Sequence, residues 1–229
     1  MKFKWDTPGR RFIAALVIAT LISEGFFVYD AARTKSLQFD YLSWNLVLAW
    51  LPLVFAARLD TVLKRKLWSS WEALALSVLW LIFLPNTFYM VSDFIHLQDT
   101  SASNAVYAAV LLTSFIYTGV TLGFSSLYLV HLQLKKRFSS RESAGWVAFV
   151  LFVCSVGVYF GRNLRWNSWD IFTNPGGLLV DIYDHLAHIA TYPEMTETTL
   201  AFFLLLCTMY NLLWRAVHML QVDAHESGE

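Results

Sequence analysis

Two short polar motifs stand at the ends of long apolar runs, and both contain side chains that could bind an anion or move a proton. The longer motif runs from Gly161 to Asp170 and holds two arginines, two asparagines, two tryptophans, a serine and an aspartate. Charged groups at such a boundary are costly unless they are paired, solvated or used. The motif from Leu84 to His96 also holds polar and charged residues beside an apolar run, so it needs the same explanation. The two motifs therefore mark a candidate site.

The longer motif has the composition of an anion-binding site. If residues 161–170 continue as a helix, Arg162 and Arg165 lie one turn apart, and paired guanidinium groups suit a phosphate or a carboxylate. The tryptophans suit the lipid headgroup layer or stacking on a ring. The candidate ligand-binding residues of this motif are Arg162, Asn163, Arg165, Trp166, Asn167, Trp169 and Asp170.

An internal ion pair is the structural explanation of the same charges. We expect Arg162 or Arg165 to pair with Asp93 or Asp170, because isolated charges at membrane depth are hard to accommodate. Such a pair leaves the second arginine available to a ligand. Since both motifs emerge on the same side of the expected helix bundle, we also expect them to line one polar pocket.

The shorter motif begins with a proline that predicts a break in the third apolar run. Pro85 has no backbone N–H and clashes with the preceding turn, so the helix should end near Leu84. Asn86 is then placed to cap a new short amphipathic or re-entrant helix. Four polar residues share one face of that helix: Tyr89, Ser92, Asp93 and His96.

Two interpretations of this polar face stay open. In the functional one, Asn86 and Tyr89 contact a ligand, while Asp93 and His96 are candidate catalytic residues, with Asp93 orienting His96 as a general base. In the structural one, the proline ends a helix at a solvated exit, and Asp93 and His96 simply pair one turn apart.

A third polar group follows Asn174-Pro175, a pair that predicts the start of a helix. Asp181, His185 and His188 lie at i, i+4 and i+7 and have the chemistry of metal ligands. Because no fourth ligand is indicated, metal binding is the weaker alternative. We expect these three residues to form the solvated face of an interfacial helix, and we predict no cofactor.

The composition places these motifs in a membrane protein. Of the 229 residues, 57% are hydrophobic and only 15% are charged, whereas soluble domains carry about a quarter charged residues. The formal net charge is zero, so nothing indicates a nucleic-acid partner. We predict an all-α polytopic membrane helix bundle, with about six transmembrane helices and short interfacial helices. We expect a single transmembrane domain over residues 1–229.

Six apolar runs approach the roughly 20 residues needed to cross a bilayer. They lie near residues 12–29, 41–57, 69–84, 104–131, 143–161 and 197–220. Most of the 17 Lys and Arg residues precede the first run or follow the second and the fourth. By the positive-inside rule both termini are then cytoplasmic, and the motif segments 85–98 and 161–190 are extracytoplasmic.

At its two motifs the chain resembles a family of uncharacterised bacterial membrane proteins, domain of unknown function 1361. The resemblance extends roughly from the third apolar run to the sixth. It implies a polytopic protein of the bacterial plasma membrane and implies no reaction. It rests on Leu84-Pro85-Asn86 with Tyr89, Asp93, His96 and Leu97, and on the whole stretch from Gly161 to Asp170.

Three classes of function fit these observations. The first is binding of an anionic amphiphile or lipid-linked substrate by Arg162 and Arg165. If the protein also acts on this ligand, it is a membrane hydrolase or transferase that uses Asp93 and His96. The second is transport, which ranks lower because the sequence shows no inverted repeat. The third is a structural or accessory subunit. The expected partners are membrane lipids, and neither enzymatic activity nor the oligomeric state is decided.

Overall fold

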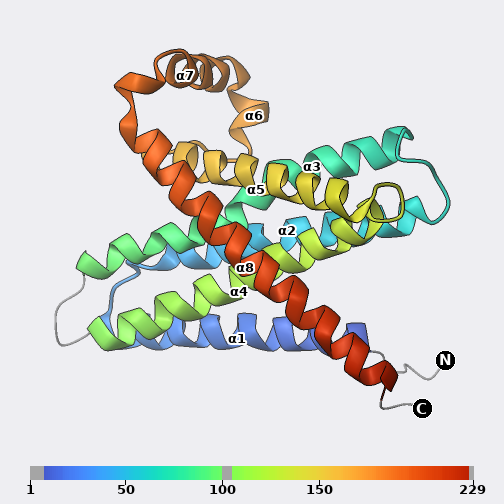
Figure 1. Cartoon of the computed structure of the whole chain (residues 1–229). Helices are drawn as coiled ribbons and strands as arrows, with labels where there is room; N and C mark the ends of the chain where they lie inside the picture. Colours follow the sequence, from blue (N-terminus) through green and yellow to red (C-terminus); the bar gives the residue numbers. More distant parts are fainter. Residues whose placement is uncertain (1–7, 100–104, 227–229) are drawn as a thin grey trace. The chain divides into compact units, whose positions relative to one another are not determined.

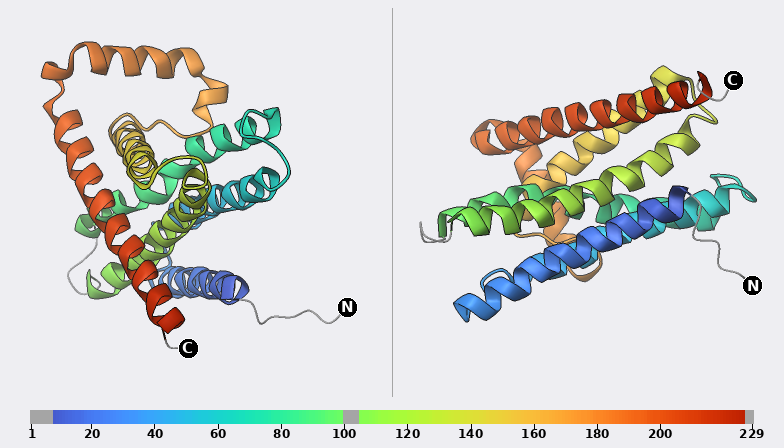
Figure 2. Two further views of the ribbon diagram at one scale, coloured as in Figure 1. Left: turned by 45° about the vertical axis from the view of Figure 1, so that its right-hand side comes forward. Right: turned by 90° about the horizontal axis from the view of Figure 1, so that it is seen from below.

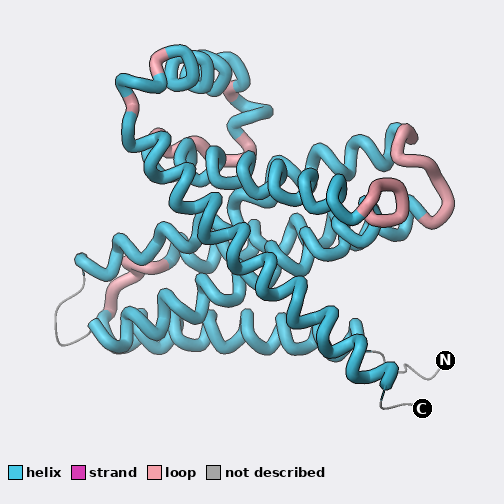
Figure 3. Tube along the Cα trace, in the orientation of Figure 1, coloured by secondary structure: helices cyan, strands magenta, loops and turns pink. Residues whose placement is uncertain are grey.

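The computed structural model describes residues 8–99 and 105–226, and in these ranges the backbone is almost entirely helical, without strands (Figure 1, Figure 3). Six of the described helices are long and apolar enough to cross a membrane. The predicted all-α, multi-pass membrane architecture is therefore confirmed. The six are α1 (Pro8–Thr34), α2 (Asp40–Leu63), α3 (Trp71–Tyr89) with its 3-10 continuation η1 (Met90–Asp99), α4 (Ala105–Leu134), α5 (Ser140–Asn163) and α8 (Pro193–Glu226).

The chain forms two compact units, residues 1–126 and 127–229, and each has its own packing. The first part of α4 belongs to the first unit, and its last turns belong to the second. The shorter motif therefore lies in the first unit, and the longer motif lies in the second.

In the first unit, α2 and α3 form a helical hairpin (Figure 2). Apolar side chains recur on α2 every three or four residues, which places them on one face of the helix. This buried stripe includes Leu42, Leu46, Ala49, Leu53 and Ala56. The hairpin is thus held by the amphipathic spacing that the sequence displays.

Two polar side chains of the first unit bond to a neighbouring helix. The Ser43 hydroxyl donates to the Glu24 carboxylate at 2.7 Å, joining α2 to α1. The Tyr107 hydroxyl donates to the Phe26 carbonyl at 2.9 Å, joining α4 to α1. Because unsatisfied polar groups are expensive at membrane depth, these bonds fix the helices relative to one another within the unit.

Two glycines let α4 approach the end of α3 closely. A Cβ atom added at Gly119 would lie 2.5 Å from the Met90 sulfur, and one added at Gly123 would lie 2.9 Å from the Thr87 Cβ. Glycines four residues apart permit this kind of approach between helices. The approach positions η1, which begins at Met90 and carries the polar part of the shorter motif.

The prediction that the third helix ends near Leu84 was wrong. α3 continues through Pro85 to Tyr89, and η1 follows without a gap, so Asn86 lies inside α3 and not at the start of a new helix. Proline is tolerated within membrane helices where side chains and neighbouring helices satisfy the freed backbone groups. Pro85 leaves the Leu81 carbonyl without its usual N–H donor, and in the following turn the Thr87 hydroxyl donates to the Leu84 carbonyl at 2.8 Å.

In the second unit, α5 and α8 pack along each other (Figure 2). α5 starts with a capping box in which Ser139 accepts the Glu142 N–H and the Glu142 carboxylate accepts the Ser139 N–H. The connection from α5 to α8 contains α6 (Asp170–Thr173), α7 (Pro175–Ala187) and the short 3-10 turn η2 (Ile189–Thr191).

Residues 161–170 do not continue as one helix. α5 ends at Asn163, and Arg165 adopts a left-handed backbone conformation with φ of 59°. The Phe160 carbonyl accepts the N–H groups of Leu164 and Trp166 at 3.2 and 3.3 Å, so the chain folds back over the helix end. Beyond this turn, the Asp170 carboxylate accepts the Asn167 N–H at 2.7 Å, and α6 begins.

Candidate functional site

The segment that joins α5 to α8 is fastened to α7 by the indole of Trp166. Its N–H donates to Asp181 Oδ2 at 2.7 Å. The Trp166 ring packs, together with Ile182, against a buried cluster formed by Tyr159, Phe160 and Met195. Because the indole N–H is occupied, the ring of Trp166 is the part left for the ligand contact that the sequence predicted.

A second carboxylate, that of Asp184, links α7 to the start of α8. The Tyr192 hydroxyl donates to Asp184 Oδ2 at 2.7 Å, and His188 Nδ1 lies 3.0 Å from Asp184 Oδ1. The hydrogen bond from Tyr192 is the main cause that lowers the pKa of Asp184 below 3.8. The same bond raises the pKa of Tyr192 above 10.0, because it stabilises the protonated phenol.

The exposed face of α7 is mostly apolar, and of the three residues predicted to be solvated, Asp181, His185 and His188, only His188 is largely exposed. Leu179, Val180, Tyr183 and Leu186 are 56–72% exposed, whereas His185 is only 7% exposed. The His185 ring stacks on Tyr192 with a centroid distance of 4.0 Å. The prediction that His185 belongs to a solvated face was therefore wrong. The aromatic rings that cover it come from other helices, and the periodicity of α7 alone carries no information about them.

The alternative metal set is not assembled. His185 Nδ1 lies 2.9 Å from the Asp181 carbonyl, while His188 is engaged with Asp184 on the exposed side of the helix end. Within residues 8–99 and 105–226, no group of three or more His, Cys, Asp or Glu side chains is placed to hold a metal ion. Asp181 and His185 instead hold α7 against Trp166 and Tyr192, and His188 pairs with Asp184 of α7 itself.

Arg165 is the most exposed charge of the longer motif that can meet an outside ligand. The expected pairing of Asp170 with an arginine was wrong, because Asp170 is engaged by the Asn167 N–H and, at 3.1 Å, by the Thr173 hydroxyl. Among the described residues Arg165 forms no ion pair, and its side chain is exposed. Arg162 lies in the last turn of α5 and is half-buried. A pair of either arginine with Asp93 stays a prediction.

The other polar residues of the longer motif line the same turn. Asn167 points its side-chain amide at the Asp170 carboxylate, 3.4 Å away, and Asn163 is exposed at the end of α5. Trp169 is half-buried and immediately precedes α6. These residues therefore surround Arg165 along the chain, with the carboxylate of Asp170 turned toward the backbone.

The shorter motif places Asp93 and His96 on one side of η1. In a 3-10 helix, residues three apart lie above one another, so Met90, Asp93 and His96 share a face. Asp93 is buried and His96 is half-buried. The His96 ring lies 5.1 Å from the Tyr41 ring of α2, measured between centroids.

The two remaining candidates of the shorter motif lie one turn earlier. Asn86 and Tyr89 are half-buried in the last turns of α3. The Tyr89 carbonyl accepts the Ser92 hydroxyl at 2.6 Å, which helps the change from α-helix to 3-10 helix. That this motif and the longer motif line one pocket stays a prediction.

Comparison with known proteins places the chain in a family. The family model described as "Protein of unknown function (DUF1361)" matches residues 44–213, which include both polar motifs. The chain belongs to this family. The resemblance that rests on the two motifs is therefore confirmed, together with the membrane character of the protein. No curated protein and no solved structure matches the chain.

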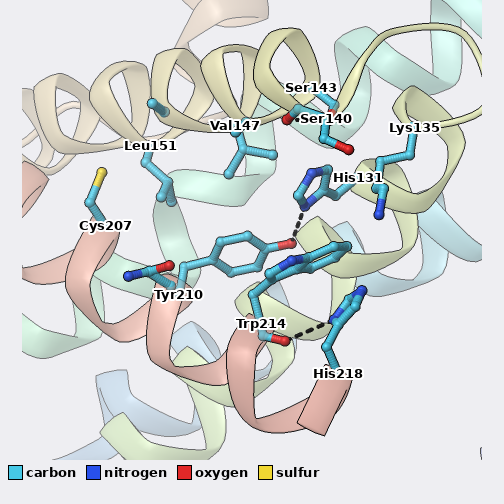
Figure 4. Close-up of a pocket in the computed structure, with 13 residues that line it drawn as sticks. His131, Lys135, Ser140, Ser143, Val147, Leu151, Cys207, Tyr210, Trp214 and His218 are labelled. Atoms are coloured by element: carbon cyan, nitrogen blue, oxygen red, sulfur yellow. Dashed lines mark hydrogen bonds between the residues drawn. The ribbon is translucent and has the colours of Figure 1, made fainter. Parts of the chain in front are cut away.

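One group of residues that could bind a ligand was not predicted from the sequence. It lines a cavity in the second unit, at the end of α8 far from α7 (Figure 4). On α8 its members recur every three or four residues, so the pattern alone could have indicated a shared face. They are Cys207, Tyr210, Asn211, Trp214 and His218. The contributions of α4 and α5 could not be found without the structure.

Proposed function

We propose that the segment between α5 and α8 binds the head of an anionic amphiphile, such as a lipid or a lipid-linked substrate. The proposal is supported by the partners of the charged side chains in this segment. Its three acidic residues, Asp170, Asp181 and Asp184, each accept hydrogen bonds from groups other than arginine. Arg165 is exposed and has no carboxylate partner among the described residues, so an external anion can fill that role.

The left-handed backbone conformation of Arg165 supports a functional role for its side chain. A left-handed conformation costs a residue with a side chain about 1–2 kcal/mol, and glycine is the usual occupant. Strain of this kind is found where function requires a particular side chain. Because the segment contains one arginine and three aspartates, recognition must depend on short-range geometry rather than on bulk attraction.

The apolar part of the proposed ligand is matched by α7. This helix turns exposed Leu179, Val180 and Tyr183 outward, as does a helix that lies in the plane of a membrane interface. The next residue after Arg165 is Trp166, which is hydrogen-bonded to Asp181 on α7. The cation and the apolar helix are therefore coupled within one unit, and together they suit a charged head attached to an apolar chain.

The proposal includes the placement of this segment at the outer surface of a bacterial plasma membrane. The basic residues gather before α1, after α2 and between α4 and α5, and such residues favour the cytoplasmic side. Both chain ends are then cytoplasmic, and the segment between α5 and α8 is extracytoplasmic.

The experiment is a comparison of two lipids with the same chains. The full chain, purified in a non-ionic detergent, is mixed with phosphatidylglycerol or with phosphatidylcholine, and the unfolding temperature is measured. Because a ligand that binds only the folded state raises this temperature, we expect a larger shift with the anionic lipid. Arg165→Gly should remove the difference, and Arg165→Lys should reduce it, since an ammonium group lacks the planar fork.

The matched control uses the other left-handed residue with a side chain. Lys35 has φ of 53°, and Lys35→Gly makes the same backbone change outside the proposed site. Neither glycine variant should lose much stability, because relief of strain offsets the backbone entropy cost of about 0.5–1 kcal/mol. Equal shifts with both lipids in the unmodified protein, or loss of the difference in Lys35→Gly, would contradict the proposal.

A second candidate function is hydrolysis or group transfer on a lipid, and the shared face of Asp93 and His96 favours it. In this alternative His96 acts as a general base that Asp93 orients. Cells that produce the unmodified protein or His96→Gln are compared by mass spectrometry of their membrane lipids. A lipid that accumulates only with His96→Gln supports catalysis, whereas identical lipid profiles contradict it.

A further inference from the structure

A cavity of about 310 Å³ lies in the second unit, among the last turns of α4, the first half of α5 and the second half of α8. Its volume is at the lower end of the range for small-molecule sites, about 300–1,000 Å³. None of the residues of the two polar motifs lines it. The cavity is therefore separate from the segment between α5 and α8 that the proposed function uses.

One end of the cavity is built around the indole of Trp214. This ring lies between the imidazoles of His131 and His218, with centroid distances of 4.1 Å to each. The Lys135 ammonium lies 5.1 Å from the centroid of the same indole, within the range of a cation–π contact. One cation and two imidazoles thus gather at a single aromatic ring.

The imidazole of His131 is held in a fixed orientation. Its Nδ1 lies 3.0 Å from the Tyr210 hydroxyl, and both side chains are buried. A hydrogen bond at one ring nitrogen sets the direction of the other. Because Nδ1 is used by Tyr210, Nε2 is the atom that His131 offers to a ligand.

The polar lining of this end is free of carboxylates. Besides Lys135 and the two imidazoles, it contains the hydroxyl groups of Ser140 and Ser143, and no Asp or Glu is among the described residues that line the cavity. Hydrogen-bond donors and cations without an acidic partner suit a carboxylate or a phosphate group.

The opposite end of the cavity is mostly apolar, although Asn211, one turn from Cys207 on α8, also lines the cavity. Along α5 the lining changes from Ser140 and Ser143 to Val147 and Leu151, and along α8 it changes from His218 to Cys207. Figure 4 shows Leu151 and Cys207 at one end and Lys135 and His218 at the other. The two helices therefore present the same gradient from polar to apolar, over about 16 Å of helix length from Ser140 to Leu151.

We propose that this cavity binds a single-chain amphiphile with an anionic head. The carboxylate or phosphate head contacts Lys135 and His131 Nε2, beside Trp214. The chain extends between α5 and α8 toward Leu151. The volume favours one chain over two, which separates this ligand from the two-chain lipids of the bilayer.

The test uses fluorescence quenching by a ligand that carries a heavy atom. The full chain in a non-ionic detergent is titrated with dodecanoate that bears bromine on its chain, and with the matching brominated dodecanol. Bromine quenches indoles that it approaches, so binding beside Trp214 lowers the emission. We expect the acid to bind at least about tenfold more tightly than the alcohol, which is the scale of one charge-assisted hydrogen bond.

Three variants assign the signal to the cavity. Trp214→Phe should remove the acid-specific quenching. Lys135→Gln should weaken acid binding about tenfold and leave alcohol binding unchanged. Lys136→Gln is the matched control, because Lys136 is a neighbouring exposed cation that bonds to Gln133 and does not line the cavity.

Unfolding temperatures of all variants establish that each is folded, and an alkyl phosphate of the same chain length separates the two head groups. Tighter binding of the phosphate identifies the head as phosphate, and tighter binding of the acid identifies it as carboxylate. The proposal is overturned by equal affinities for the acid, the phosphate and the alcohol. It is also overturned if Lys136→Gln weakens acid binding as much as Lys135→Gln does.

Discussion

Trp166 and Asp181 are fifteen residues apart in the chain, yet the indole N–H of one donates to the carboxylate of the other at 2.7 Å. This bond joins the turn after α5 to the first half of α7. Arg165 directly precedes Trp166, so the position of its side chain depends on the same bond. The geometry of the proposed anion site therefore rests on a residue pair in which neither member is an arginine.

Loss of the Trp166 hydrogen bond should loosen the segment between α5 and α8. A hydrogen bond to a charged group contributes about 1.5–3 kcal/mol, and the partial exposure of this pair reduces that figure. Trp166→Phe keeps an aromatic ring against Tyr159 and Phe160 but leaves Asp181 without its donor. We expect faster hydrogen exchange of amides 164–187, measured by mass spectrometry, while α1 to α3 stay unchanged.

The control for this experiment is Tyr183→Phe. Tyr183 is 72% exposed on the outer face of α7, so loss of its hydroxyl should leave exchange in the segment as it was. If Trp166→Phe exchanges at the same rate as the unmodified protein, the bond to Asp181 does not hold the segment.

Acid should detach the start of α8 from α7. The Tyr192 hydroxyl lowers the pKa of Asp184 below 3.8, so the stabilisation from their bond is present above pH 3.8. It is lost as the pH falls through the lower pKa that Asp184 has in the folded protein. We expect Tyr192→Phe to speed hydrogen exchange of amides 188–192 at pH 5 to 7, with this difference vanishing on acidification below 3.8.

High pH should break the same hydrogen bond by deprotonating Tyr192. The pKa of Tyr192 is raised above 10.0 by its bond to Asp184, so the stabilisation is complete below that pH and is lost as the pH rises through the folded-state value. A tyrosinate absorbance difference between the unmodified protein and Tyr192→Phe should therefore appear only above pH 10. A difference that titrates below 10 would show that Asp184 does not accept this bond.

Local signals in the sequence predicted the six long helices and the start of α7. Six apolar runs became six long helices, because the length and hydropathy of a membrane helix are properties of one segment. Asn174 caps α7 as expected, since its side chain accepts the Gly177 N–H at 3.1 Å. Both features depend on residues that are neighbours in the chain.

Features that depend on distant residues were not predicted. His185 is buried because Tyr159 and Tyr192 come from other helices, and spacing within α7 cannot reveal such partners. Pro85 does not break α3, which continues to Tyr89 beside the close approach of α4. The cavity beside Trp214 was missed for the same reason, since three helices contribute to it.

Gly123 should be the most sensitive glycine of the first unit. A methyl group there meets the Thr87 Cβ at 2.9 Å, and overpacking of this kind costs about 1–3 kcal/mol. We expect Gly123→Ala to lower the unfolding temperature in detergent. Gly25→Ala is the control, because a Cβ at Gly25 has nothing within 4 Å and alanine favours helix.

A double variant separates overpacking from other effects of the new methyl group. Thr87→Ala removes the hydroxyl, which is the nearest group that a Cβ at Gly123 would meet, and keeps the Thr87 Cβ. The combination with Gly123→Ala should therefore be less destabilising than the sum of the two single changes. Strict additivity would show that the close approach of α4 to Thr87 does not set the cost.

The orientation of the second unit can be tested with two engineered cysteines in bacterial cells. Cys154 and Cys207 are first replaced by alanine, so that no native thiol reacts. A cysteine at Thr196, exposed at the start of α8, should react with a membrane-impermeant maleimide in intact cells. One at Phe138, which is 39% exposed between α4 and α5, should react only after lysis, because the basic residues around it favour the cytoplasm. Labelling of Phe138→Cys alone in intact cells would invert the orientation and place Arg165 in the cytoplasm.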